Sequence, residues 1–452
     1  MLRITYLELR NFRRFERFSI DFHNELTVIV ARNGQGKTSV LDGVSMALGT
    51  FVGAFDRGKA QGIDKSDARL VRMGNSSESA TQYPVYLEAI FDAPSMKVAR
   101  ELTGPKNKTT VKSASEITRY GEHLQASIRT AEQVPLPIVA YYGAGRLWKV
   151  HKNMERKQVV SADRTMGYED CLSPSSNFVQ CQQWMAKATL ARQQEMELPA
   201  DERPLVSMAD RIGAIQHAVD IVLENEGWSR FSYSFAHEEL VMFNSDAGFM
   251  PVSMLSDGVR AMVSLVADIA FRCVRLNGYM GREAIEQTCG IVLIDEVDIH
   301  LHPAWQQRVI GTMRKAFPNI QFVVTTHSPQ VLTSVENASI RIIENEYRDG
   351  SGTLITISHS VDMQTKGVAS SDVLSQVMDV DPFPPLPIVK EFREYKDLIQ
   401  QNYYDTPEAL ELRGKLIDLY GEKHFFILEC DRLIRLAKYR ATLKQKADSR
   451  HA

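Results

Sequence analysis

The sequence predicts an α/β fold with a mixed sheet, an antiparallel β subdomain, a helical insertion and a C-terminal helical tail. The prediction of the sheet depends on three short apolar runs, each followed by polar residues or a glycine-rich turn. They are LTVIVA, GIVLI and FVVTT, at residues 26–31, 290–294 and 322–326. Strands that are apolar throughout are buried on both faces, as at the centre of a parallel sheet. Helices are predicted from apolar residues at helical spacing, as in TSVLDGVSMAL after the first run.

Size and composition indicate an ordinary folded protein. A chain of 452 residues exceeds the usual size of one core, so we expect one elaborated domain or two domains. The formal net charge of -3 gives no global basic field that would indicate nucleic-acid binding, although a local basic patch could still bind it. The five cysteines are scattered, which fits a reducing compartment and offers no zinc cluster. No window approaches the roughly 20 apolar residues of a membrane span, so we expect a cytoplasmic protein.

The first apolar run leads into a turn with the features of a phosphate-binding loop. The motif is G-x-x-x-x-G-K-[ST], and Ala31 stands where it begins with glycine. Residue 31 supplies no ligand, and alanine would be costly there only if the backbone needed a positive φ. In such loops, backbone amides surround phosphate oxygens, the lysine reaches the β- and γ-phosphates, and the hydroxyl ligates Mg²⁺. The predicted nucleotide-binding residues are Asn33, Gly34, Gln35, Gly36, Lys37, Thr38 and Ser39.

Polar residues follow the other two apolar runs. Asp295 and Glu296 come directly after GIVLI, and adjacent carboxylates at the end of a buried strand are too costly to be packing residues. We expect Asp295 to hold Mg²⁺ with Thr38 or through water, and Glu296 to polarise the attacking water. The plainer alternative is an acidic strand end that faces solvent. The third run delivers His327 to the same sheet edge, where it would hydrogen-bond the γ-phosphate, although a lone histidine is more often structural.

A fourth motif lies between the loop and the carboxylates. Residues 252–272, VSMLSDGVRAMVSLVADIAFR, read as Leu-Ser-Asp-Gly followed by an amphipathic helix. Ser-Asp-Gly before a helix is also an ordinary N-cap, so the structural alternative is strong. A helix start also binds anions, so Ser256 and the amide of Gly258 are predicted to contact a γ-phosphate presented by another subunit. Asp257 would repel that phosphate in a dry interface, so we expect it to cap its helix and point aside.

The order of these four motifs resembles the ATP-binding cassette (ABC) ATPases, within the soluble branch that includes the SMC, RecF and OLD proteins. ITYLELRNFRRF, LSDGVR and DEVDIHLHP are similar to that branch's first strand, signature motif and Walker B motif. The resemblance implies an ABC-ATPase (P-loop) head, of which two copies enclose two ATP molecules with Mg²⁺. It implies that Glu296 and His327 are catalytic, that Thr38 and Asp295 are metal ligands, and that Ser256, Asp257 and Gly258 contact the ATP of the other copy.

Two further features of this branch are the glutamine loop and the segment with His300 and His302. The glutamine loop is not placed: PIVAYYGAGRLW, at residues 137–148, lies at the expected point and offers Arg146 but no glutamine. His300 and His302 fall in the segment that the resemblance puts against the other subunit, so we expect them to be structural rather than a metal pair. Asp257, the absent glutamine loop and the N-terminal strands disfavour the membrane-transporter members of the ABC family.

The rest of the chain suggests four parts. They are an N-terminal lobe with Walker A (1–150), a helical insertion (151–235), a C-terminal lobe with the signature, Walker B and histidine motifs (236–365), and a helical tail for oligomer or partner docking (381–452). YPVYLEAIF and TTVKSAS have the pattern of strands, and RIIENEYRDGSGTLITIS that of a hairpin. The absence of sustained heptads between Thr38 and Ser256 excludes long coiled-coil arms.

Further segments are similar to the PtuA ATPases of Septu and retron-linked anti-phage systems. They are VAYYGAGR, RTMGYEDCL, QQWM and SSDVLSQVM. This resemblance implies a homodimer or higher oligomer that holds a separate HNH nuclease of the PtuB kind and controls its cutting through the nucleotide state. The metal-ligand pattern of the OLD nucleases is not found after the histidine strand, where only LECD, at residues 428–431, is similar to its start.

The basic end of the tail leaves an alternative function open. A charged run on a terminal helix is most simply a solvated face, but it could also dock DNA phosphates or an acidic partner protein. The alternative is therefore a RecF-like clamp in DNA repair, which would bind DNA with a steep salt dependence and only with ATP. The basic residues are Arg432, Arg435, Lys438, Arg440, Lys444, Lys446 and Arg450.

Overall fold

The computed structural model divides the chain into two compact units, Met1–Val373 and Leu374–Ala452. The described residues are 1–72, 78–145, 163–174, 178–347 and 354–451. Arg146 and the turn of the expected hairpin near residue 350 lie outside them. The division of the chain into four functional parts stays a prediction.

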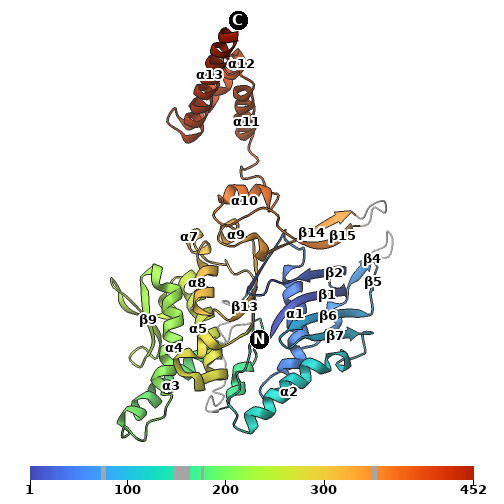
Figure 1. The fold of residues 1–452 in the computed structure, drawn as a ribbon, viewed down its shortest axis with the longest axis vertical. Coiled ribbons are helices and arrows are strands. Elements are labelled where there is room, and N and C mark those ends of the chain that lie inside the picture. Colours follow the sequence, from blue (N-terminus) through green and yellow to red (C-terminus); the bar gives the residue numbers. More distant parts are fainter. Residues whose placement is uncertain (73–77, 146–162, 175–177, 348–353, 452) are drawn as a thin grey trace. The chain divides into compact units, whose positions relative to one another are not determined.

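A six-stranded mixed sheet forms the centre of the first unit (Figure 1). Its order is β15-β14-β3-β13-β12-β8, and every neighbouring pair is parallel except β14 with β15. Each residue of β3, β8, β12 and β13 is buried, which confirms the strands that the apolar runs predict. The bounds are β3 Leu26–Ala31, β8 Ile138–Tyr142, β12 Gly290–Ile294, β13 Ile320–Thr326, β14 Ile340–Tyr347 and β15 Leu354–Ser360.

The antiparallel part comprises three smaller sheets, β2-β1-β6-β7, β11-β10-β9 and β4-β5. The side-chain amide of Gln321 on β13 accepts from the Ile4 amide and donates to the Ile4 carbonyl of β1, each at 2.8 Å, and so joins two sheets. The bounds are β1 Arg3–Phe12, β2 Phe15–Asp21, β4 Leu70–Arg72, β5 Ser79–Thr81, β6 Val85–Asp92, β7 Met96–Leu102, β9 Trp228–Ser234, β10 Glu239–Asn244 and β11 Gly248–Pro251. TTVKSAS is not a strand: it contains a 3-10 turn and the start of α2.

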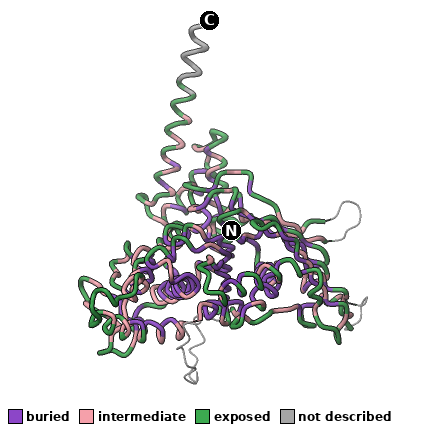
Figure 2. Tube along the Cα trace, turned by 60° about the horizontal axis from the view of Figure 1, so that its bottom comes forward, coloured by how far each residue is buried: buried purple, intermediate pink, exposed green. Residues whose placement is uncertain are grey.

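Helices cover both sides of the large sheet. Helix α1 contacts β1 and β6 on one side and β3, β12 and β13 on the other, so it lies between two sheets. Helices α3, α4 and α5 pack together, and α5 also contacts β8. Figure 2 shows the buried residues of the unit concentrated in its interior. The bounds are α1 Lys37–Val52, α2 Ser115–Arg129, α3 Phe178–Glu197, α4 Met208–Leu223, α5 Asp257–Asn277, α6 Ala284–Gln287, α7 Pro303–Gln306, α8 Val309–Ala316, α9 Pro329–Leu332 and α10 Ser370–Gln376.

The second unit is a bundle of three helices with its own core. Helix α11 spans Pro387–Gln400, α12 spans Pro407–Tyr420 and α13 spans Phe425–His451. Both α11 and α12 have proline in their first turn, where its missing amide and fixed φ suit a helix start. Over the described residues of the whole chain, no helix has the length and apolar character needed to cross a bilayer. The core residues are Phe392, Tyr395, Ile399, Ala409, Leu412, Leu416, Ile427 and Cys430.

Candidate nucleotide-binding site

Three of the four sequence motifs end neighbouring strands of the large sheet. Strand β13 lies between β3 and β12, and both pairings are parallel. In this register Thr326 of β13 faces Val30 of β3, and Val324 of β13 faces Ile294 of β12. Because the carboxyl ends of parallel strands meet at one edge, the glycine-rich loop, His327 and the acidic pair come together there. Sheet pairing, rather than nearness in sequence, assembles this group.

The loop between β3 and α1 has the backbone that a phosphate-binding turn requires. Gly34 and Gly36 adopt φ of 77° and 98°, in the left-handed region that favours glycine. A Cβ at Gly36 would also overlap the ring of Phe15, whereas one at Gly34 would meet nothing within 4 Å. Gln35 closes the turn, since its amide donates to the Arg32 carbonyl at 3.2 Å. Asn33 is exposed in this loop and Ser39 is buried in α1.

Ala31 fits the end of β3 without strain. It is a buried strand residue and pairs with Ile343 of β14. Its φ is not in the positive region that a glycine would be needed to reach. The departure of residue 31 from the loop pattern therefore leaves the loop geometry unchanged.

Lys37, the first residue of α1, is buried between the loop and β13. Its Nζ donates to the Ala31 carbonyl at 3.0 Å and lies 2.6 Å from His327 Nε2. Burial lowers the pKa of Lys37, and the nearby carboxylates of Asp295 and Glu296 oppose that shift. Burial also lowers the pKa of His327, with the charge of Lys37 as the second cause. A neutral imidazole whose Nε2 accepts from the ammonium is consistent with both directions.

Asp295 joins α1 to the end of β13. One carboxylate oxygen accepts from Thr38 Oγ1 at 2.8 Å, and the other accepts from Thr325 Oγ1 at 2.6 Å. A threonine hydroxyl and a carboxylate in contact are oxygen ligands of the kind that Mg²⁺ prefers, so these residues fit the ion. The described residues contain no group of three or more His, Cys, Asp or Glu that could hold a metal.

Glu296 is held in an unusual backbone conformation just beyond β12. Its φ of 49° is in the left-handed region, which a non-glycine residue rarely adopts without support from its surroundings. Its amide donates to Thr325 Oγ1 at 2.8 Å, so one threonine side chain contacts both acidic residues. We did not predict Thr325. The signal available was a pair of threonines ending an otherwise apolar strand, immediately before His327.

Arg14 is a second residue that sequence reasoning missed. It lies between β1 and β2, donates from Nη1 to the Gly34 carbonyl, and donates from Nη2 to Asn345 Oδ1 at 3.2 Å. Burial lowers the pKa of this guanidinium. The structure thus places a cation directly against the loop. The signal was the basic pair in NFRRF, between two strands of the N-terminal hairpin.

The signature residues form the start of α5 and are at least partly exposed. Ser256 occupies the N-cap position and Asp257 is the first helical residue, so the expectation that Asp257 caps its helix is wrong. The Asp257 carboxylate instead pairs with Arg260 at 2.6 Å, because an acidic group one turn away from an arginine forms an ion pair readily. A Cβ at Gly258 would lie 2.7 Å from the His300 carbonyl oxygen, so the glycine allows this close approach.

His302 accepts from the Ala304 amide at 3.3 Å and caps α7. A capping role accounts for its presence without a metal.

Comparison with known proteins finds AAA-domain models, retron probable ATPases and Septu PtuA proteins. One family model, an AAA domain, matches residues 6–204, and another, described as an AAA domain, putative AbiEii toxin, Type IV TA system, matches residues 192–333. The retron Ec83 probable ATPase of Escherichia coli is 25% identical over 93% of this chain and 84% of its own length. The Septu protein PtuA of Bacillus mycoides (strain KBAB4) is 24% identical over 76% of this chain and 41% of its own length. The chain is thus similar to retron probable ATPases and to Septu PtuA proteins, at 24–25% identity.

A solved structure, the SmcHead bound to the C-winged helix domain of ScpA, matches 79% of this chain and 98% of its own with a TM-score of 0.47 and 16% identity. In this chain the predicted site residues fall into two groups. The loop, the acidic pair and His327 meet at one sheet edge, as the contacts of Lys37 and Thr38 establish. Ser256, Asp257 and Gly258 form a second group at the start of α5, whose described polar contacts stay within that helix.

Proposed function

We propose that this chain binds and hydrolyses ATP between two copies of itself, and that its nucleotide state controls a separate HNH nuclease in anti-phage defence. The observation that carries the first part is the meeting of Lys37, Asp295 and His327 at one edge of the sheet. The second part is supported by the similarity to retron and Septu proteins.

In this proposal each side chain at the sheet edge has one task. The amides of the loop bind phosphate oxygens, since Gly34 and Gly36 have the φ values that turn them inward. Lys37 leaves its two present acceptors for the β- and γ-phosphates. Thr38 and Asp295 hold Mg²⁺, which when bound neutralises charge on the phosphates and helps the leaving group depart.

Two further groups act on the attacking water and on the γ-phosphate. Glu296 polarises it as general base, held by the contact of its amide with Thr325. His327 is uncharged and binds the γ-phosphate by donating from Nε2, which requires the tautomer protonated at that nitrogen once Lys37 has left it for the phosphates. Because Glu296 and His327 end different strands, a small displacement between β12 and β13 would separate base from phosphate and stop hydrolysis.

The second copy completes the pocket. Helix α5 has 21 residues and presents the positive end of its dipole at Ser256, where the hydroxyl and the following amides can bind an anion. Since Ser256 and Asp257 are exposed, a second molecule can approach them. The lobes at 1–150 and 236–365 would then each give one face of the shared interface, and the insertion at 151–235 would support α5.

The three-helix unit is our proposed dock for the partner nuclease or for further copies. It has its own core, so it can serve as a separate module, and it exposes large apolar side chains that this core does not use. Isolated exposed apolar residues are common, but several on one small bundle indicate a binding surface. They include Tyr403, Leu410, Leu419, Phe425, Leu428 and Tyr439.

Light scattering of Glu296→Gln with ATP and Mg²⁺ tests the shared pocket. This variant should keep ATP and accumulate as a dimer, whereas Lys37→Ala should stay monomeric because it lacks the phosphate contact. A Glu296→Gln protein that hydrolyses ATP at the parental rate would refute the assignment of the base. For the partner, deletion of residues 388–452 should release a co-expressed HNH nuclease and spare the dimer. ATP-dependent, steeply salt-sensitive DNA binding without any nuclease would instead favour the clamp.

A further inference from the structure

A buried ion pair on α5 lies outside the nucleotide site. Arg272 Nε donates to Asp268 Oδ2 at 2.9 Å, with side-chain exposures of 4% and 0%. Burying two charges costs several kcal/mol per ion, and the pair repays that only with excellent geometry and further hydrogen bonds. A buried ion pair is therefore weak evidence for a role in stability. The other hydrogen-bond partners of Asp268 and Arg272 point to a further role.

These partners connect the pair to the edge strand of the sheet. The hydroxyl of Tyr142, the last residue of β8, donates to the same oxygen of Asp268 at 2.7 Å. The carbonyl of Tyr142 accepts from the Asp295 amide at 2.8 Å. Tyr142 is 1% exposed, so both contacts are sealed from water. A continuous path of hydrogen bonds therefore runs from the proposed magnesium ligand Asp295 through Tyr142 to Asp268 on α5.

The carboxylate of Asp268 is unevenly satisfied. Both donors, Tyr142 and Arg272, use Oδ2, while Oδ1 is buried with no hydrogen-bond partner among the described residues. A pair selected only for stability would use both oxygens, since an unmade buried bond is costly. Because Oδ1 makes no such bond, the Asp268 carboxylate can rotate to follow a small displacement of the Tyr142 hydroxyl. The arrangement can therefore adjust to the position of β8.

The same helix carries the signature residues at its start. Asp268 is 11 positions after Asp257, or roughly 17 Å along the helix axis at 1.5 Å per residue. A helix transmits displacement along its axis because its hydrogen bonds hold successive turns together. Movement at Asp268 is thereby carried to Ser256 and Gly258.

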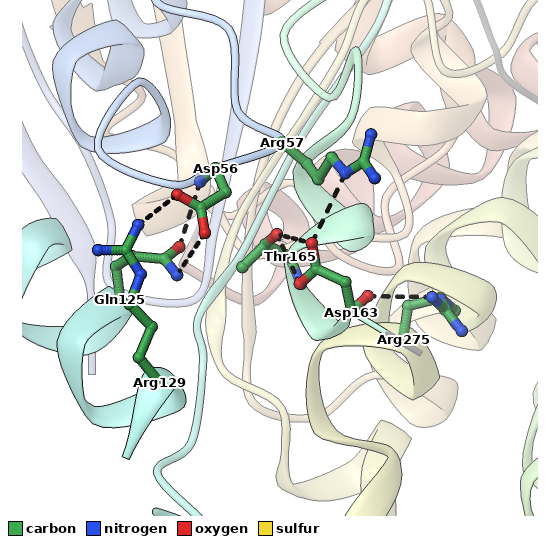
Figure 3. Close-up of polar contacts among 7 residues, drawn as sticks. All are labelled: Asp56, Arg57, Gln125, Arg129, Asp163, Thr165 and Arg275. Carbon is green, nitrogen blue, oxygen red and sulfur yellow. Dashed lines mark hydrogen bonds and ion pairs between the residues drawn. The ribbon is translucent and has the colours of Figure 1, made fainter. Parts of the chain in front are cut away.

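The other end of the pair is anchored. Arg272 Nη1 donates to the Gly167 carbonyl at 2.8 Å and to the Glu169 carbonyl at 3.1 Å. In the same stretch, the carbonyl of Asp163 accepts from Arg275 at 3.0 Å, and the Asp163 carboxylate pairs with Arg57 at 3.6 Å (Figure 3). These hydrogen bonds restrain the Arg272 end of the pair, so an adjustment to a movement of Tyr142 falls on Asp268.

We infer that Tyr142, Asp268 and Arg272 are positioning residues that couple the occupied nucleotide site of one subunit to the placement of its own signature helix. The inference rests on the proposed function, because it assumes that Asp295 moves when nucleotide and Mg²⁺ bind and that Ser256 to Gly258 act on the ATP of a second copy. Occupancy of one pocket would thereby prepare the same molecule to complete the other.

Tyr142→Phe is the sharpest test, because it removes only the hydroxyl that contacts Asp268. Tyr168→Phe is the matched control. Tyr168 is equally buried, and its hydroxyl donates to the Pro137 carbonyl at 2.7 Å rather than to Asp268. ATP affinity, the ATP-dependent dimerisation constant and the urea unfolding midpoint are measured for the full chain and both variants. Hydrogen exchange of residues 255–264 is followed with and without ATP and Mg²⁺.

Tyr142→Phe should bind ATP like the parent but lose about 5- to 150-fold in ATP-dependent dimerisation, the usual range for coupling between sites. Tyr168→Phe should lose stability only. Equal dimerisation by both variants would leave Tyr142 a purely structural residue and overturn the inference.

A parent protein that binds ATP without dimerising would instead refute the proposed function. In that case hydrogen exchange tests whether the nucleotide site is coupled to the start of α5. A nucleotide effect at residues 255–264 that Tyr142→Phe alone abolishes supports it. The same effect in all three proteins, or none in the parent, refutes it.

Discussion

Gly36→Ala is expected to weaken nucleotide binding strongly through geometry alone, without removing any ligand. The change adds one methyl group where φ is 98°, a conformation that costs an L-residue about 1–2 kcal/mol. The added Cβ would also overlap the buried ring of Phe15, and overpacking of this kind typically costs about 1–3 kcal/mol. Together these give about 2–5 kcal/mol. A loop that escapes the strain by changing conformation must regain it to bind phosphate, so the cost falls on affinity.

Gly34→Ala separates the two contributions. Gly34 has a similar φ of 77°, but a Cβ there would meet nothing within 4 Å, so only the backbone cost of about 1–2 kcal/mol applies. In titrations with ATP, Gly34→Ala should lose roughly 5- to 30-fold in affinity and Gly36→Ala at least roughly 30-fold, at 1.4 kcal/mol per factor of ten. Urea unfolding without nucleotide shows how much cost the folded loop retains. Binding by Gly36→Ala within a few-fold of the parent, or tighter than by Gly34→Ala, would refute the reasoning.

Three further predictions concern the neighbouring contacts. Thr325→Val should slow Mg²⁺-dependent hydrolysis at least tenfold while leaving metal-free nucleotide binding nearly intact, because the hydroxyl contacts both Asp295 and the Glu296 amide; steady-state kinetics over a magnesium series checks this. The free energy of unfolding should fall as the pH drops below 6.5, since the folded state lowers the pKa of His327 and protonation favours the unfolded chain; denaturation of His327→Gln should lack this part of the dependence. Gly258→Ala should weaken ATP-dependent dimerisation by displacing α5 from the His300 carbonyl, whereas Gly213→Ala, a helical site with no neighbour within 4 Å, should not; light scattering distinguishes them.

The strands and their terminal motifs could be predicted because each depends on local pattern. Runs such as GIVLI are apolar throughout, and a helix or strand end is where a charged group can reach solvent or substrate. The mixed sheet with its buried central strands is confirmed by the burial of every residue in β3, β12 and β13. That Lys37 and Asp295 lie at one edge also followed, since parallel strands present their carboxyl ends together.

What sequence reasoning missed depends on partners that are far apart in the chain. Arg14 contacts Gly34 and Asn345 only because the N-terminal hairpin folds over the loop, and no periodicity contains that information. TTVKSAS has strand-forming residues, yet it contains a 3-10 turn, and β6 pairs with Met96–Leu102. Asp257 was expected to cap α5, but Ser256 is the N-cap and Arg260 one turn on pairs with the carboxylate.

The position of β13 explains why the site needs the whole first unit. Lys37 and Asp295 are 258 positions apart in the sequence. They come to one edge because β13 is inserted between β3 and β12, and Thr325 at the end of β13 contacts both Asp295 and Glu296. The position of Thr325 depends on distant parts of the chain. Gln321 joins β13 to β1, and β13 pairs with a strand on each side. A shift of β13 would therefore displace the proposed metal ligand Asp295, the proposed base Glu296 and His327 together. A nucleotide bound across the ends of β3 and β12 would oppose such a displacement. A ligand that binds only the assembled sheet edge stabilises the strand pairing that forms this edge.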